Sequence, residues 1–289
     1  MTTVRRRLVP YFLLGPGLLW LVIFFVLPMY FMGRLSLDSG SLETGFTFSW
    51  QWSNYKDALS LYDTQFVRSF YYAGAATLIA LLIAYPLAYA IAFRAGKWKN
   101  VLLFAVVAPF FTTYLIRTLA WETILSDQSP VVHALRTIGL VGSNSGVLAT
   151  STAVIAGITY NFLPFMVLPI YASLERLDPS LIEAAKDLYA SPQAAFRRVT
   201  LPLSAPGVVA GTLLTFIPAA GDYINAFFLG STTNHMIGNS IQGLYLTQRN
   251  YPQAAALSFV LMALIMVMVI VYIRFAGSEA LMGEEAKKA

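Results

Sequence analysis

Six long apolar stretches constrain the fold of this chain more than any other feature. They cover residues 8–32, 66–93, 101–125, 147–172, 206–229 and 254–275. Each is close to the ~20 residues that an α-helix needs to cross about 30 Å of hydrocarbon. Because lipid offers no partner to backbone N–H and C=O groups, each crossing is expected to be helical. The sequence therefore predicts an all-α integral membrane protein, with six transmembrane helices forming one domain over residues 1–289.

The charged residues agree with this class. Only 11% of the chain is charged, whereas soluble domains carry about 25% because water must cover their surface. The first apolar stretch follows Arg5, Arg6 and Arg7, as a signal peptide would. It is longer than the ~7–15 apolar residues of a signal peptide, so we expect a helix that is not cleaved.

The placement of lysine and arginine predicts the orientation. Positive residues gather in the cytoplasmic connections of membrane proteins. With the N-terminus inside, most of the 19 basic residues are cytoplasmic, namely Arg5, Arg6, Arg7, Arg94, Lys97, Lys99, Arg176, Lys186, Arg197, Arg198, Arg274, Lys287 and Lys288. We therefore expect a multi-pass protein of the cell (inner or plasma) membrane with both termini in the cytoplasm. The net charge of +5 then reports topology, and nucleic-acid binding is not expected.

Few residues could support covalent chemistry or hold a metal. The chain has no cysteine, which excludes disulfides and thiolate zinc sites. Its two histidines, His133 and His235, lie far apart in expected loops and are interpreted as ordinary loop residues. No metal site and no catalytic constellation is predicted.

The connection between the fourth and fifth stretches carries strong local signals. Asp178–Pro179 and Ser191–Pro192 each combine a helix N-cap with proline at the first helical position. We expect two short helices, with the second ending at Leu201–Pro202 because the residue before proline avoids the helical region. The result is a cytoplasmic hairpin over 178–202 with exposed small residues, which suits docking to a partner, although a plain surface connection between two spans is the alternative.

The segment from Glu183 to Ser191, continuing from Phe196 to Leu203, resembles the EAA loop of ABC-importer permeases. In that family the loop forms the coupling helix that fits a cleft of the cytoplasmic ATPase subunit. The resemblance assigns ATPase coupling to Glu183, Ala184, Ala185, Asp187, Leu188, Tyr189 and Ala190, and it also matches Leu201 and Pro202. Tyr189 departs from the usual glycine at the turn, where a left-handed backbone would cost a bulky residue about 1 kcal/mol or more.

The resemblance extends over nearly the whole chain. Three further segments look like those of the spermidine/putrescine permease group: Pro109–Trp121, Leu163–Pro169 and Gly221–Tyr223. It implies a type I ABC-importer permease that moves polyamines or a similar small cation, although permeases for opines, iron, thiamine or sugars remain alternatives. It also implies two cytoplasmic ATPase subunits, a second homologous permease and an extracytoplasmic binding protein. ATP and magnesium would bind the ATPases, since this sequence has no GxxxxGK[ST] phosphate loop.

Ionisable residues inside the bilayer are candidate functional residues because burying them is unfavourable. Asp222 follows Pro218 and Gly221 in an apolar stretch, which predicts a broken helix beside a cavity or another chain. We expect a substrate pathway lined by Asp222, Tyr223, Glu122, Trp121, Tyr160 and Asn161. Asp222 could instead cap a helix end or pair with a second permease subunit, and Glu122 could simply lie at the outer interface.

Arg117 is the remaining charge inside the third stretch. It lies five residues before Glu122, about 140° around a helix, so the two are poorly placed to neutralise each other. We expect Arg117 in a structural ion pair, or against water or the face of Trp121. One alternative to an ABC permease remains, a stand-alone transporter coupled to an ion gradient through Asp222 or Glu122. A membrane-embedded enzyme is disfavoured because the apolar stretches hold no catalytic constellation.

Overall fold

A computed structural model describes residues 14–139, 141–142 and 146–277 of the chain. Five helices in this part are long and apolar enough to cross a membrane, or six if one bent pair is a single span. They are Leu14–Leu35, Asp63–Phe93, Ser151–Glu175, Pro192–Ala220 and Tyr251–Phe275, and the bent pair is Gly96–Phe111 with Tyr114–Leu125. The predicted all-α membrane fold is confirmed. Residues 8–13 of the first expected span, Arg5–Arg7, Lys287 and Lys288 lie outside the described residues.

The described residues form two compact units, one within Met1–Asp63 and Ile241–Met262, the other within Thr64–Ser240 and Ala263–Ala289. The expectation of one domain stays a prediction.

The first unit combines the N-terminal helix with a small β-hairpin and short helices. Its elements are η1 (Val22–Val26), α2 (Leu27–Leu35), β1 (Asp38–Ser41), β2 (Gly45–Phe48), α3 (Ser53–Leu61), η6 (Gly243–Thr247) and the start of α14 (Tyr251–Tyr272). The two strands form an antiparallel hairpin in which Asp38 pairs with Phe48. Asn54 Nδ2 fastens α3 to this hairpin by donating to Ser36 O and Asp38 O, both at 3.0 Å.

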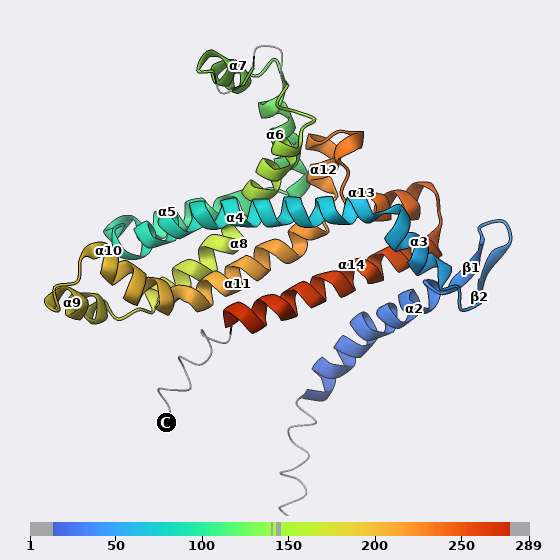
Figure 1. Cartoon of the computed structure of the whole chain (residues 1–289), viewed down its shortest axis with the longest axis horizontal. Helices are drawn as coiled ribbons and strands as arrows, with labels where there is room; N and C mark the ends of the chain where they lie inside the picture. The colour runs from blue at the N-terminus through green and yellow to red at the C-terminus, as the bar shows by residue number, and fades with distance from the viewer. Residues whose placement is uncertain (1–13, 140, 143–145, 278–289) are drawn as a thin grey trace, which may run out of the picture. The chain divides into compact units, whose positions relative to one another are not determined.

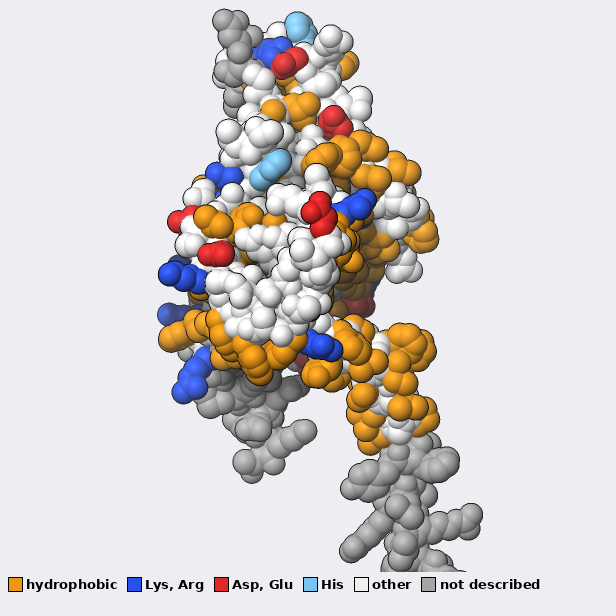
Figure 2. Space-filling model, turned by 90° about the vertical axis from the view of Figure 1, so that its right-hand side faces the viewer, with side chains coloured by type: hydrophobic (Ala, Val, Ile, Leu, Met, Phe, Trp, Pro, Cys, Tyr) orange, Lys and Arg blue, Asp and Glu red, His pale blue; other side chains and the backbone are white. Residues whose placement is uncertain are grey.

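The N-terminal helix Leu14–Leu35 presents its apolar side chains to the surroundings. None of its most hydrophobic window is buried within the chain, and Trp20, Phe24 and Phe25 are each about 60% exposed. Figure 2 shows hydrophobic side chains covering this helix down to the grey N-terminal residues. Such a surface is stable against lipid or another apolar helix.

The second unit contains the remaining long helices. Its elements are α4 (Asp63–Phe93), η2 (Gly96–Trp98), α5 (Lys99–Val107), η3 (Ala108–Phe111), α6 (Tyr114–Leu125), α7 (Pro130–Thr137), α8 (Ser151–Glu175), α9 (Pro179–Asp187), α10 (Pro192–Ala195), η4 (Phe196–Thr200), α11 (Leu201–Ala220), α12 (Ile224–Leu229), η5 (Thr232–Asn234), α13 (Ile237–Gln242) and η7 (Ile273–Gly277). Within it, α8 packs along α11, and buried alanines of α4 share a core cluster with Met166 and Ile170 of α8; α9 and α10 lie at one end (Figure 1).

Small residues allow these helices to approach closely. One face of α4 consists of alanines with no exposed surface, Ala73, Ala76, Ala80, Ala84 and Ala88. On α11, Gly207 and Gly211 form a GxxxG pattern against α8. A Cβ added to Gly207 would lie 2.5 Å from Ser173 Cβ and 2.6 Å from Pro169 O. The α8–α11 contact therefore depends on glycine at this position.

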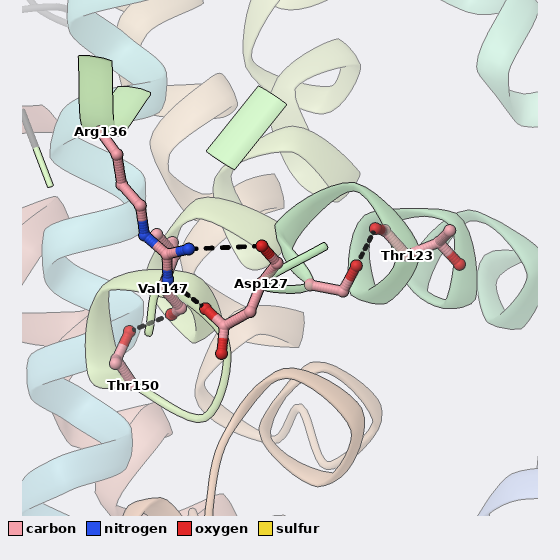
Figure 3. A network of polar contacts seen from close by, with 6 residues as sticks. Thr123, Asp127, Arg136, Val147 and Thr150 are labelled. Carbon is pink, nitrogen blue, oxygen red and sulfur yellow. Dashed lines mark hydrogen bonds and ion pairs between the residues drawn. The ribbon is translucent and has the colours of Figure 1, made fainter. Parts of the chain in front are cut away.

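A polar loop follows α6. Arg136 Nη2 donates to Asp127 Oδ1 at 2.6 Å, and Arg136 Nη1 donates to Asp127 O at 3.3 Å (Figure 3). Nearby, Thr150 Oγ1 donates to Val147 O at 2.7 Å, and Thr150 then caps α8 by accepting from Ala153 N. These contacts fix the turn between α6 and α7 and the start of α8.

Two expectations about helix continuity are wrong. The third stretch is not one straight helix, because Gly96–Phe111 and Tyr114–Leu125 meet at 96°. The depth of Glu122 in the membrane therefore cannot be counted along one straight helix. Nor does the second hairpin helix end at Leu201–Pro202: the π-helical turn η4 continues directly into α11. In a π-helical turn the hydrogen bonds run from residue i to i+5, which alters the backbone pairing just before Pro202.

Candidate functional site

Both expected caps hold the hairpin helices. Asp178 Oδ1 accepts from Ser180 N at 2.9 Å, and Pro179 is the first residue of α9. The hydrogen bond from the Ser180 backbone N–H holds the pKa of the Asp178 carboxyl below its ordinary value. Ser191 Oγ accepts from Ala194 N at 3.2 Å, with Pro192 opening α10. The predicted helix starts are confirmed.

The turn between the helices places Tyr189 in the left-handed region, with φ at 60°. Tyr189 N donates to Lys186 O at 2.9 Å and Ala190 N donates to Ala185 O at 3.0 Å, which is the Schellman pattern of a helix end. Glycine normally occupies this position because it has no Cβ to clash. Tyr189 therefore takes the left-handed backbone that glycine would adopt here, which answers the question that the sequence left open about this turn.

The hairpin tip, defined as residues 183–190, is largely exposed. Tyr189 is 98% exposed and Leu188 is 82% exposed. Glu183, Ala184, Lys186 and Asp187 are also exposed, whereas Ala185 and Ala190 are half-buried. An exposed aromatic side chain on a strained turn, next to an exposed leucine, is typical of a surface that contacts another molecule.

The base of the hairpin is anchored in the helical bundle. Ala195 is buried, and the ring of Phe196 packs edge-on against Tyr85 of α4 at 5.7 Å between centroids. On the other side, Lys99 Nζ of α5 donates to Glu175 Oε1 at the end of α8. The hairpin is thus joined to α11 through continuous helix and to α4 through the Phe196 ring, while the Lys99–Glu175 pair joins α5 to the end of α8.

The break expected around Asp222 is present. α11 ends at Ala220 and α12 begins at Ile224, with Gly221–Tyr223 between them. Asp222 Oδ1 accepts from Ile224 N at 2.8 Å and from Asn225 N at 3.1 Å. Asp222 thus caps α12, which is one of the two alternative roles inferred from the sequence.

Asp222 also belongs to a buried polar cluster, defined as Tyr114, Thr118, Asn161, Asp222 and Asn225. Tyr114 Oη donates to Asp222 Oδ2 at 2.6 Å, and Asn225 Nδ2 donates to the same carboxylate oxygen at 2.5 Å. Asn161 Nδ2 donates to Asn225 Oδ1 at 3.1 Å. Four members are at most 6% exposed, while Tyr114 is half-buried. The cluster joins α6, α8 and α12 at the two helix breaks.

Arg117 differs from its prediction. Among the described residues no carboxylate lies within 4.0 Å of Arg117, so the expected ion pair is not formed between them. Its guanidinium carbon instead lies 5.1 Å from the centroid of Phe110 and 5.6 Å from that of Tyr114. Trp121, the ring that the sequence suggested, is not the partner. The bend between η3 and α6 accounts for the difference, because it brings Phe110 back over the first turn of α6.

The other expected pathway residues are divided between places. Trp121 and Tyr160 meet edge-on with centroids 5.4 Å apart. Tyr223 is 41% exposed beside the buried Asp222. Glu122 is half-buried and forms no hydrogen bond or ion pair to the described residues. The structure therefore joins Asp222 to Asn161 through Asn225, and Trp121 to Tyr160, while a pathway shared by all six residues stays a prediction.

Sequence reasoning missed Tyr114, Thr118 and Asn225 as members of the polar cluster. A signal was present, because Tyr114 and Thr118 are four apart and Asp222 and Asn225 are three apart. Residues at these spacings share a helix face. Polar residues that share faces within apolar stretches predict a buried interhelical contact.

Comparisons with known proteins agree on one class. Residues 3–278 match the family described as binding-protein-dependent transport system inner membrane component. The chain is 36% identical over 256 residues to the spermidine/putrescine transport system permease protein PotB of Haemophilus influenzae, covering 88% of this chain and 90% of the relative. It is 36% identical over 260 residues to PotB of Escherichia coli K12, covering 88% and 93%.

Solved structures show the same fold at lower identity. A bacterial ABC transporter that imports the acidic polysaccharide alginate aligns with a TM-score of 0.70 at 19% identity, covering 95% of this chain and 97% of that one. The alginate transporter in complex with its periplasmic protein also gives 0.70 at 19% identity, covering 96% of both chains.

Proposed function

The chain belongs to the family of binding-protein-dependent transport system inner membrane components, and we propose that it conducts polyamines into the cytoplasm while a partner hydrolyses ATP. It is a membrane-spanning permease subunit of an ABC importer. The proposal adds the substrate, the route of coupling and the set of partners.

Coupling to the ATPase is assigned to the hairpin tip. The observation that carries this assignment is the exposure of Leu188 and Tyr189 on a turn that keeps its strained backbone. Strain of this kind is retained where function requires it. The hairpin continues through η4 into α11, whose far end is the break at Asp222. Movement of a docked ATPase could thus reach the polar cluster as a rigid-body displacement of one continuous helix.

The assembly needs several partners. We assign to it two cytoplasmic ATPase subunits that bind ATP, a second homologous permease and an extracytoplasmic binding protein. The apolar surface of Leu14–Leu35, which is unburied in this chain, supports packing against lipid or the second permease. The alginate transporter of similar fold was solved with a periplasmic protein, which agrees with such an assembly. We propose that both termini lie in the cytoplasm, on the same side as the hairpin, so that the hairpin faces the ATPases.

Polyamines are the substrate class that best fits the relatives and the residues. The PotB proteins are spermidine/putrescine permeases by name, and they match nearly nine-tenths of this chain. Polyamines carry several ammonium groups, which are attracted by carboxylates and by aromatic faces. We propose that Asp222, Tyr223, Glu122, Trp121, Tyr160 and Asn161 contribute to the pathway. Asp222 and Asn161 are both buried, so they would not touch the substrate directly. Asp222 would attract the cation by its negative charge, and Asn161 would hold the polar cluster in place.

A charge reversal at the hairpin tip tests this proposal. The transporter is reconstituted with its ATPases, second permease and binding protein, and uptake of labelled spermidine is measured beside ATPase co-purification. We expect Glu183→Lys to abolish both, while wild type shows both.

The matched control is Glu43→Lys, the same charge reversal at an exposed residue of the β-hairpin turn. It should keep ATPase co-purification. Full retention of the ATPase and of uptake in Glu183→Lys would overturn the coupling role, whereas a wild-type complex without spermidine uptake would overturn the substrate.

A further inference from the structure

Arg117 is a buried cation without a counter-ion in the described part of the chain. The residue is 9% exposed, and its Nε and Nη1 atoms are buried with no hydrogen-bond partner. An arginine cannot relieve this by losing its proton at physiological pH. Buried charged donors without acceptors are destabilising, so the buried position of the Arg117 side chain is unfavourable unless another interaction compensates.

What holds Arg117 is a pair of aromatic rings from both arms of the bent span. Phe110 belongs to η3, before the bend, and Tyr114 begins α6, after it. The guanidinium carbon lies within cation–π distance of both ring centroids, at 5.1 and 5.6 Å. The two faces therefore form a site that accommodates a positive group in this structure.

The surroundings of the site suit an ammonium group. Tyr114 Oη donates to Asp222 Oδ2 at 2.6 Å, which places a carboxylate at the far end of one of the two rings. Phe110 also packs against Phe165 of α8 at 5.0 Å between centroids. Between the arms, Thr112 and Thr113 have extended backbone. Irregular backbone at membrane depth is tolerated where it lines a cavity or is covered by protein, and such breaks are where transporters bind substrate.

We infer that the rings of Phe110 and Tyr114 form a binding site for a substrate ammonium group, which Arg117 occupies when substrate is absent. The inference rests on the proposed polyamine transport. An arriving ammonium competes with the guanidinium for the same faces, and the displaced Arg117 gains access to acceptors that it lacks here. Because Arg117 touches rings on both sides of the bend, its displacement also releases a contact that stabilises the bend. Substrate binding is thereby linked to the conformation of the third span.

The test is spermidine uptake by the complete reconstituted transporter, with KM measured for matched variants. Phe110→Leu removes one face from the substrate ammonium and also weakens the competing guanidinium, so KM should rise about twofold, less than the fivefold effect of one cation–π contact without a competitor. Phe111→Leu is the control: it is the neighbouring residue, 79% exposed and outside the site, and its KM should equal that of wild type.

Arg117→Gln removes the resident cation and should lower KM about fivefold, whereas Arg117→Lys should stay within twofold of wild type. In Phe110→Leu/Arg117→Gln the lowering should disappear. Equal KM values for Phe110→Leu and Phe111→Leu would overturn the site, whether or not Arg117→Gln assembles. Equal values for Arg117→Gln and Arg117→Lys would overturn the competition. A wild-type transporter that takes up no spermidine would instead refute the proposed substrate, and the site with it.

Discussion

Replacing Tyr189 separates the backbone of the hairpin turn from the contact that its ring makes. Tyr189 has φ at 60° and is 98% exposed, so its ring packs against almost nothing in the chain. Tyr189→Ala keeps the left-handed strain and removes the ring. Tyr189→Gly removes both the strain and the ring. The pair of variants therefore isolates each contribution.

The magnitudes follow from this geometry. Truncating an exposed ring should change the stability of the chain by less than about 0.5 kcal/mol. Glycine should relieve about 1–2 kcal/mol of left-handed strain. It should also lose about 0.5–1 kcal/mol through the greater entropy of the unfolded chain. If the ring is buried in the ATPase, either variant should lose about 2 kcal/mol of binding, or about 30-fold in Kd.

The assay is titration of the ATPase onto the permease in lipid nanodiscs, beside thermal unfolding of the permease alone. We expect Tyr189→Ala and Tyr189→Gly to weaken ATPase binding alike while unfolding changes little. ATPase binding by Tyr189→Ala at the wild-type Kd would refute the reasoning, because the ring would then contribute nothing to docking.

Two further predictions concern the supports of the hairpin. Gly207→Ala should destabilise the folded chain by about 1–3 kcal/mol, because the new Cβ would meet Pro169 O at 2.6 Å. Gly74→Ala is its control in α4, where nothing lies within 4 Å, and thermal unfolding in detergent should show no loss; equal loss in both variants would contradict the packing argument. Asp178→Ala should speed amide hydrogen exchange in α9. The folded-state pKa of Asp178 is lowered, so its contribution is present at neutral pH and is lost as pH falls through that lowered value, whereas Asp178→Asn should retain a pH-independent cap; α9 protection factors in wild type that do not change with pH, after correction for intrinsic exchange, would contradict this.

Much of the fold could be predicted because the burial of apolar helices in lipid leaves a direct pattern in the sequence. Apolar stretches of bilayer length identify the spans, and the Asp178–Pro179 and Ser191–Pro192 pairs identify helix starts within a residue. The break at Asp222 was also predictable, since Pro218 and Gly221 precede a carboxylate. These signals are local, so tertiary contacts did not alter them.

The missed features depend on geometry that no local pattern contains. Pro109 indicates irregular backbone, but the 96° bend requires Thr113 to cap a new helix, with Thr113 Oγ1 accepting from Ile116 N. Only after that bend does Phe110 become the ring nearest Arg117. Similarly, Leu201–Pro202 reads as a helix end, yet the preceding π-helical turn lets the helix continue. The partner of a buried charge is therefore not readable from spacing along one assumed straight helix.

The central claim, that the hairpin tip docks to the ATPase in the cytoplasm, is tested most directly with a single thiol. The chain contains no cysteine, so Ala184→Cys, at an exposed residue of the hairpin tip, carries a unique one and keeps the Tyr189 ring. In whole cells this thiol should resist membrane-impermeant maleimide, and in inverted vesicles it should react and cross-link to the ATPase subunit. Labelling of the thiol from outside intact cells would contradict the account. So would a thiol in inverted vesicles that reacts at the same rate with and without bound ATPase and forms no cross-link to it.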